Sequence, residues 1–239
     1  MIKIILFIFR LHLFFVSYLI YLLNILFLLF NFKSISRKIF IFSAYLCSIS
    51  LGIKYKINTK FKVFLLKDGI HIVNHDSPLD IFIAQCFFRI PTITTVDNHL
   101  NKILPFFKSS LINCGHFNFD HLDLNERRLA YNFLLRKSKI DKKILIFPSG
   151  SIYTSIKKRF SRSIAKLSLK NKLDVIAWKI SFKEKGSDYI KYDKNLLMFI
   201  LRRFFSERTI FEVQELKVFP YSKFTKEKDL HKILCDFYI

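Results

Sequence analysis

The feature that most constrains the fold is a run of 20 residues, 11–30, without Lys, Arg, Asp or Glu. As a helix this run measures about 30 Å, which matches the hydrocarbon thickness of a bilayer. A second apolar run of 15 residues, 39–53, measures about 22 Å and suits an interfacial or re-entrant helix better than a span. We therefore expect a membrane-associated helical pair within residues 1–56.

The charges of the first 56 residues favour attachment to lipid. This segment holds seven Lys or Arg residues and no Asp or Glu, and the basic sequence KSISRK lies between the two apolar runs. A turn beside anionic headgroups has this composition. A cleaved signal peptide is the competing interpretation, but the apolar run is too long and no small-residue cleavage site follows it. Both flanks are basic, so the sequence leaves open whether the first helix spans the membrane or re-enters.

The chain as a whole is strongly basic, with 40 Lys and Arg against 18 Asp and Glu and a formal charge of +22. Such a charge predicts an anionic partner: a nucleic acid, an acidic protein or an anionic membrane. Abundant Phe, Ile, Lys and Tyr also indicate an AT-rich genome, which explains part of the charge. Apolar residues make up 51%, which excludes a mainly disordered chain. The four cysteines form no C-x-x-C pair, so we expect reduced structural thiols and no metal site.

Residues 57–239 have a different sequence pattern from the first 56 residues. Short predicted strands alternate with predicted helices, which indicates a layered α/β domain. Apolar runs rich in branched residues predict strands at 61–66, 69–74, 93–96, 143–147, 175–182 and 211–218. Helices are expected at 77–88, 103–111, 125–138, 160–170 and 226–237. A charged segment is expected before the last strand. No repeat and no internal linker indicate a further domain.

The chemistry is concentrated where the strand at 69–74 meets a helix. Two His–Asp pairs are spaced five apart there, His71 with Asp76 and His75 with Asp80. His71 lies inside the apolar strand, whereas His75 follows its end, where side chains of α/β folds reach the ligand crevice. A His there can act as a base, and an Asp can orient it. A helix-capping box that begins at Ser77 explains Asp80 equally well, and the two interpretations are compatible.

Four segments resemble one known family. The sequence Asn74-His75-Asp76-Ser77-Pro78-Leu79-Asp80 resembles the N-H-x-S-x-x-D block of the 1-acyl-glycerol-3-phosphate acyltransferase family of glycerolipid acyltransferases. Further blocks are similar in the same order: KILP at 102–105 with GHFNFDH at 115–121, IFPSGS at 146–151 and VIAW at 175–178. The resemblance implies a mixed β-sheet flanked by helices, preceded by a membrane-associated helical pair. It divides the chain into a membrane segment, 1–56, and an acyltransferase-like domain, 57–239.

The resemblance also implies the site. His75 and Asp80 are the expected catalytic residues. The expected substrate-binding residues are Asn74, Ser77, Gly115, His121, Phe147, Pro148, Ser149 and Gly150. Three positions depart from the family pattern: His121 and Ile152 stand where the family has Arg, and Ser149 stands where it has Glu. A basic cluster follows them and is a further candidate for holding a phosphate, namely Lys157, Lys158, Arg159 and Arg162. A solvated or headgroup-facing surface is the alternative for this cluster.

The activity implied is transfer of a fatty acyl group from acyl carrier protein or acyl-CoA to a hydroxyl of a lysophospholipid, such as 1-acyl-glycerol-3-phosphate, in phospholipid biosynthesis. No metal or bound cofactor is expected. The expected partners are membrane lipids and the acyl donor, with no nucleic acid. The expected location is a membrane, with the catalytic domain on the cytoplasmic face of a bacterial inner membrane. The alternatives are another acceptor, such as a different lysolipid or a lipidated amine, a catalytically impaired pseudoenzyme, and a nucleic-acid-binding module.

Overall fold

The computed structural model describes residues 2–74, 77, 79–82, 86–87, 105–117, 123–148, 162–184, 196–206 and 208–238. The chain divides into two compact units. Unit 1 comprises residues 1–56, 77–89 and 181–212, and unit 2 comprises residues 57–76, 90–180 and 213–239. Two strands, β4 (Val175–Glu184) and β5 (Thr209–Phe219), contribute residues to both units.

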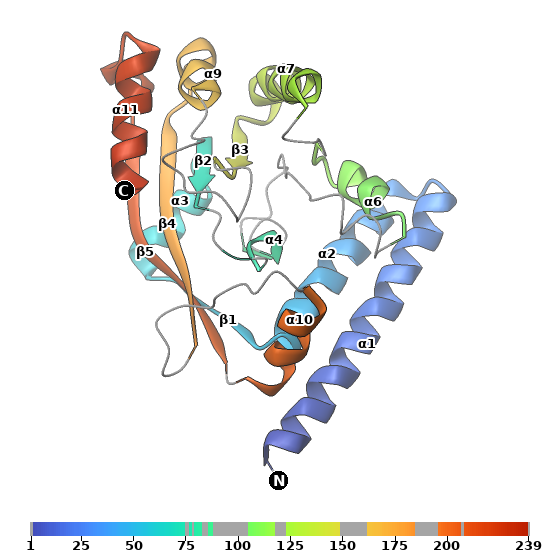
Figure 1. The fold of residues 1–239 in the computed structure, drawn as a ribbon. Helices are drawn as coiled ribbons and strands as arrows, with labels where there is room; N and C mark the ends of the chain where they lie inside the picture. Colours follow the sequence, from blue (N-terminus) through green and yellow to red (C-terminus); the bar gives the residue numbers. More distant parts are fainter. Residues whose placement is uncertain are drawn as a thin grey trace. The chain divides into compact units, whose positions relative to one another are not determined.

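Unit 1 contains the predicted helical pair (Figure 1). Its elements are α1 (Ile2–Leu29), α2 (Lys33–Ser50), β1 (Ile53–Lys56), α4 (Asp80–Phe82) and α10 (Leu196–Phe205). The turn between α1 and α2 uses Asn31 in the left-handed conformation (φ 63°). α1 has the length and the apolar composition that a membrane span requires. It begins nine residues before the run from which it was predicted.

Polar side chains join α1 to α2 inside an otherwise apolar hairpin. The Ser36 hydroxyl donates to Asn24 Oδ1 (2.7 Å), and the Ser17 hydroxyl donates to the Ser43 carbonyl (2.9 Å). All four residues are buried. Small serine side chains allow two helices to approach closely, and hydrogen bonds between helices retain their value where water is absent. This composition suits a pair of helices that lies in lipid.

Unit 2 is a layer of helices on a sheet. Its helices are α3 (Thr59–Leu65), α6 (Phe107–Asn113), α7 (Leu124–Asp141), α9 (Ser163–Asn171), α11 (Glu227–Tyr238) and the 3₁₀ turn η2 (Tyr221–Lys223). Its own strands are β2 (Gly69–Val73) and β3 (Lys143–Ile146). The sheet has the order β1-β5-β4-β2-β3. β2 runs parallel to β3 and β4, and β1 runs parallel to β5. The neighbouring strands β4 and β5 run in opposite directions, because β4 leads from unit 2 into unit 1 and β5 leads back. The sheet is therefore mixed, as predicted.

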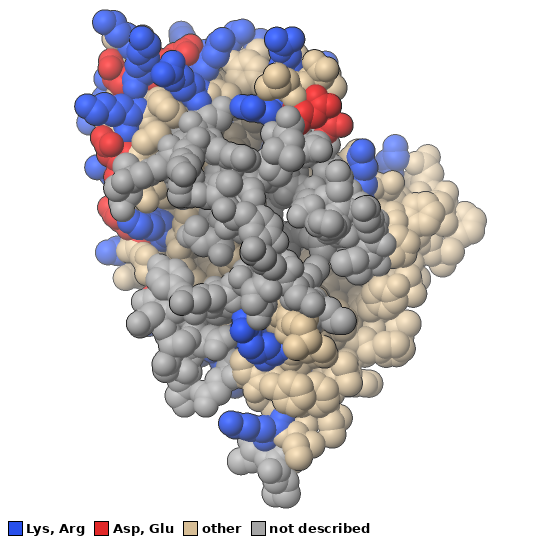
Figure 2. All heavy atoms as spheres, in the orientation of Figure 1, with Lys and Arg blue, Asp and Glu red and all other residues tan. Residues whose placement is uncertain are grey.

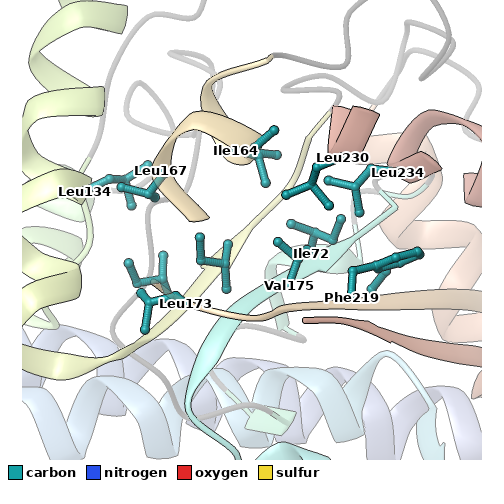
Figure 3. Packing of buried hydrophobic residues seen from close by; sticks show 13 residues of the cluster. Ile72, Leu134, Ile164, Leu167, Leu173, Val175, Phe219, Leu230 and Leu234 are labelled. Carbon is teal, nitrogen blue, oxygen red and sulfur yellow. The ribbon is translucent and has the colours of Figure 1, made fainter. Parts of the chain in front are cut away.

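The core of unit 2 lies between one face of the sheet and the helices α7, α9 and α11 (Figure 3). Ile72 and Val175 point from the strands toward Ile164 of α9 and Leu230 of α11. All five residues of β2 are buried, as is typical of a parallel strand covered on both faces. This packing fixes the strand that leads into the predicted catalytic block.

Most predicted elements of unit 2 form near their expected bounds, but one prediction was wrong. Residues 61–66 were expected to form a strand, and the chain there forms α3 instead. The Asn58 side chain accepts a hydrogen bond from the Lys60 N–H (3.1 Å) and caps the helix. Phe61, Phe64 and Leu65 are the half-buried residues, which is a helical spacing rather than the alternation of a strand. The strand predicted at 93–96 lies outside the described residues.

Among the described residues, the strand β1, the helix α10 and the 3₁₀ turn η2 were not predicted. β1 joins the edge of the sheet beside β5, with Ile53 opposite Thr209. α10 occupies part of the segment that was expected only to be charged. Of the helix predicted at 77–88, the described residues contain the helical turn α4 and the positions around it.

Candidate active site

The carboxyl ends of neighbouring strands meet at one edge of unit 2. β2 ends at Val73 and the parallel β3 ends at Ile146, with Ile72 opposite Ile146. In open α/β sheets this edge is where ligands bind. Asn74 follows β2, and Phe147 follows β3. The first residues of the first and third predicted blocks therefore lie at the same edge of unit 2.

Asn74 fastens the end of β2 to β4 through its side chain. Its Nδ2 donates to the Ile180 carbonyl (3.0 Å), and its Oδ1 accepts from the Ile180 N–H (2.7 Å). In a regular parallel ladder a main-chain carbonyl would accept that N–H, so the amide side chain replaces one rung. Asn74 is buried. Its side chain therefore fixes the backbone immediately before His75, a residue that lies outside the described part of the chain.

In unit 1, Ser77 and Asp80 form the predicted capping box. The Asp80 carboxylate accepts from the Ser77 N–H (3.0 Å), and the Ser77 hydroxyl accepts from the Leu79 N–H (3.2 Å). The Asp80 N–H donates to the Ser77 carbonyl (3.1 Å). Asp80 is 1% exposed, so its carboxylate is withdrawn from water and held in one orientation. These are the properties that an orienting carboxylate needs.

His71 lies in the core of unit 2, as its place inside an apolar strand predicted. Its Nδ1 accepts from the Trp178 indole N–H (3.1 Å), so Nε2 carries the proton and donates to the Lys67 carbonyl (3.0 Å). The two rings stack with centroids 5.9 Å apart. Burial lowers the pKa of His71 to about 4. His71 is therefore a neutral structural side chain near pH 7.

Gly115 ends α6 in a Schellman motif. The His116 N–H donates to the Leu111 carbonyl (3.0 Å), and the Gly115 N–H donates to the Ile112 carbonyl (2.9 Å). Gly115 has φ +87°, a conformation that glycine adopts without strain. The structure thus gives this residue a part in the backbone of the second block, whose His121 lies outside the described residues.

The third block begins in the sheet and continues beyond the described residues. Phe147 and Pro148 are buried directly after β3. Arg162 is exposed and precedes α9. Burial and, secondarily, the positive charge of Arg162 lower the pKa of His231 on α11, so the guanidinium and the imidazole lie near each other. The predicted site residues outside the described part are His75, His121, Ser149, Gly150, Lys157, Lys158 and Arg159.

Tyr238 is a residue at this edge that the sequence did not reveal. Its hydroxyl donates to the Ile72 carbonyl (2.8 Å) and lies 3.3 Å from the Trp178 carbonyl. The C-terminal helix α11 is thereby fastened to β2 and β4 close to where both strands approach the predicted site. In the sequence, Tyr238 is only an aromatic residue at the end of an amphipathic helix. A residue in such a position is more often part of the core.

A polar hollow of about 560 Å³ lies at the opposite, amino-terminal edge of the strands in unit 2. Lys67, Lys142 and Asp174, which precede β2, β3 and β4, line it. It is separate from the edge that carries the predicted blocks. Within the described ranges, no group of three or more His, Cys, Asp or Glu side chains is arranged to hold a metal ion.

Comparison with known proteins agrees with this reading of the fold and the blocks. The family described as Acyltransferase matches residues 55–181, more than half of the chain. The crystal structure of the 1-acyl-sn-glycerophosphate (LPA) acyltransferase, PlsC, from Thermotoga maritima has the same fold, with a TM-score of 0.62 and 15% sequence identity. The alignment covers 100% of this chain and 96% of that chain. No curated protein matches significantly. The family match includes every block from which the resemblance was predicted, and the chain belongs to the acyltransferase family.

Proposed function

We propose that this acyltransferase moves a fatty acyl group from an acyl thioester to a hydroxyl of a lysophospholipid such as 1-acyl-glycerol-3-phosphate. The donor is acyl-CoA or acyl carrier protein. The similar Thermotoga maritima structure is that of a 1-acyl-sn-glycerophosphate acyltransferase. The acidic and basic groups needed for transfer belong to the chain itself, so the proposed reaction requires no metal, bound cofactor or acyl-enzyme.

In the proposed mechanism His75 removes the proton from the acceptor hydroxyl. The oxygen then attacks the thioester carbonyl, the carbon–sulfur bond breaks, and the proton passes from His75 to the leaving thiolate. Asp80 holds the imidazole in the tautomer that presents a basic nitrogen and stabilises the imidazolium that forms. Binding both substrates in line contributes several kcal/mol of the rate enhancement by itself.

The observation that carries this proposal is the state of Asp80. The Asp80 residue is 1% exposed, and its carboxylate accepts a hydrogen bond from the Ser77 N–H. This carboxylate, five residues after His75 in the sequence, is therefore held in one orientation. Holding a carboxylate out of water is costly unless hydrogen bonds support it, and the capping box supplies that support. The capping box and the catalytic role are thus parts of one arrangement.

We further propose that the basic cluster Lys157, Lys158, Arg159 and Arg162 binds the acceptor phosphate. Ser149 and Ile152 lack the charges of the family pattern, and the cluster begins five residues after Ile152. Arg162 is exposed before the first turn of α9. The helical pair attaches the enzyme to the membrane in which its acceptor dissolves, and we propose that the catalytic domain faces the cytoplasm.

Membranes that contain the full chain, incubated with a radiolabelled acyl donor and a panel of lysolipids, test the function. Labelled phosphatidic acid from 1-acyl-glycerol-3-phosphate supports the proposal. Label on a different lysolipid identifies another acceptor. The absence of transfer to every acceptor, with both donors, contradicts the proposal and favours a pseudoenzyme.

A further inference from the structure

The helix α10 of unit 1 has an apolar face open to solvent. Phe199 and Phe204 are buried, whereas Met198, Leu201 and Phe205 are 55%, 39% and 58% exposed. The exposed residues recur at spacings of three and four, so they share one face of the helix. A soluble protein rarely leaves three large apolar side chains together on a ten-residue helix unless they meet a partner.

Arg10 fastens this helix to α1. Its Nη1 donates to three carbonyls at the carboxyl end of α10, those of Arg203, Phe204 and Ser206, at 2.9, 3.3 and 2.5 Å. The carboxyl end of a helix has a partial negative charge, which the guanidinium compensates. Arg10 is 3% exposed, although it lies in an apolar helix. The residues on either side of Arg10 in the sequence, Phe9 and Leu11, are apolar. The three carbonyl oxygens at the end of α10 therefore help to compensate the charge of the guanidinium.

Aromatic rings complete the junction. Phe7 of α1 stacks on Phe205, with centroids 4.3 Å apart and planes 9° apart. Phe14 meets Phe204 edge to face at 5.4 Å. Phe7, Arg10 and Phe14 are spaced by three and four, so one stripe of α1 bears the whole contact. Wherever the amino-terminal half of α1 lies, α10 must lie beside it.

The exposed apolar side chains of α1 continue this face. Ile4, Ile5, Ile8 and Phe9 occupy the same turns as Phe7 and are each more than half exposed. In Figure 2 the described surface over α1 is uncharged along most of its length. Phe205 belongs to both surfaces, because it is exposed and stacks on Phe7. The exposed face of α10 is thus continuous with the helix that is apolar enough to cross a membrane.

We propose that α10 is a third membrane-contacting helix, whose Met198, Leu201 and Phe205 enter the interfacial layer of the leaflet that receives the amino-terminal half of α1. The described surface is built mainly from aliphatic and aromatic side chains, and neither α1 nor α10 contains an acid. Lys3 and Arg202 are exposed on the two helices and suit anionic headgroups. This inference does not depend on catalytic activity.

The test places a reporter on the proposed surface of the full chain. Leu201→Trp puts an indole on α10, and Leu129→Trp puts one on the exposed face of α7 as a control. The single native tryptophan, Trp178, is fully buried, so its signal can be subtracted. Each protein is bound to vesicles of phosphatidylethanolamine and phosphatidylglycerol, with or without brominated acyl chains, and is then titrated with aqueous iodide.

The proposal predicts that bromine quenches the Leu201→Trp emission and shifts the residual spectrum to the blue, while iodide has little effect. Leu129→Trp should show the reverse. Quenching of both variants by iodide alone would place α10 in water and overturn the proposal. Protection from both quenchers that disappears on dilution would indicate a protein contact and would also overturn it.

A second pair of variants tests the energetic contribution. Met198→Glu with Leu201→Glu should weaken binding to the same vesicles by about tenfold or more, because two apolar contacts with lipid are replaced by carboxylates. Leu129→Glu with Ile140→Glu changes two exposed apolar residues of α7 and should leave binding unchanged. Equal effects of the two pairs would contradict a specific contact through α10.

Discussion

Burial decides what His71 can do. His71 is enclosed between Trp178 and the Lys67 carbonyl, and both ring nitrogens are used. It therefore stays neutral and cannot exchange protons with a substrate. His75, four residues later, follows the end of the strand, where the family block places a catalytic base. The two histidines share a spacing to aspartate, but only His71 belongs to the strand β2.

Removal of His71 should destabilise the fold without ending transfer. His71→Ala leaves a cavity in the core and removes the hydrogen bonds of His71 with the Trp178 N–H and the Lys67 carbonyl, which costs about 2–4 kcal/mol of the free energy of unfolding. The folded protein that remains should still transfer acyl groups. Urea unfolding together with the transfer assay measures both quantities. Wild-type stability of His71→Ala would contradict the structural role.

The same residue predicts a pH dependence. The pKa of His71 is about 4 in the folded chain against an ordinary value of 6.5. Below pH 6.5 the unfolded chain binds a proton that the folded chain does not, so stability falls as the pH falls from 6.5 toward 4. The loss amounts to about 3 kcal/mol at the lower end. His71→Ala should lack this component, and identical pH profiles of unfolding would refute the assignment.

A matched pair of variants separates the helix-capping role of Asp80 from its proposed catalytic role. Asp80→Asn keeps an oxygen for the Ser77 N–H but loses the charge that the proposed mechanism uses to orient His75, so transfer should slow by about a hundredfold or more at nearly constant melting temperature. Asp80→Ala loses both functions and should cost about 1 kcal/mol in addition. If Asp80→Asn transfers at the wild-type rate, Asp80 serves only as a helix cap.

At the scale of elements, the sequence predicted those that local signals determine. The helix α7 and the strand β2 form within a few residues of their expected bounds because periodicity and flanking residues specify them. α10 was not predicted, because a short apolar run does not reveal which distant part of the chain it packs against. Its environment is supplied by Arg10, 193 residues away from Arg203 in sequence. α3 was mistaken for a strand because branched residues outweighed the capping signal of Asn58.

The junction of α1 and α10 should depend on the charge of Arg10. Arg10→Met preserves the length of the side chain and removes its hydrogen bonds to three carbonyls. Charge-assisted bonds contribute about 1.5–3 kcal/mol each when buried, so the carboxyl end of α10 should open more readily. Hydrogen exchange of the α10 amides should accelerate, while the amides of α7 remain protected. Unchanged exchange in α10 would show that the aromatic contacts alone hold the junction.

At the scale of the whole molecule, the α/β class and the helical pair followed from the sequence, whereas the order of the strands did not. The pairing of β1 with β5 joins Ile53 to Thr209, and no local pattern specifies a contact of that separation. The site shows the same division. Asn74, Ser77 and Asp80 were predicted as site residues because they form one continuous block, whereas no local pattern predicted the hydrogen bond from Tyr238 to the Ile72 carbonyl.

Attachment of the whole chain to lipid should rest on apolar insertion. Salt screens surface charges but does not weaken the burial of an apolar helix, so molar salt and carbonate should leave the protein in the membrane pellet. Release by salt alone would show that the basic surface, not α1, holds the chain.

The measurement that tests the central claim most directly compares His75→Ala, His71→Ala and wild-type protein in the labelled transfer assay, with membrane recovery and melting recorded for each. Wild-type protein should transfer the acyl group to a lysophospholipid hydroxyl. His71→Ala should retain a measurable rate in whatever protein folds. His75→Ala should lose transfer while remaining folded and membrane-bound, because the base alone is removed. Transfer by His75→Ala at the wild-type rate would contradict the catalytic assignment and leave the capping box as the sole role of this block.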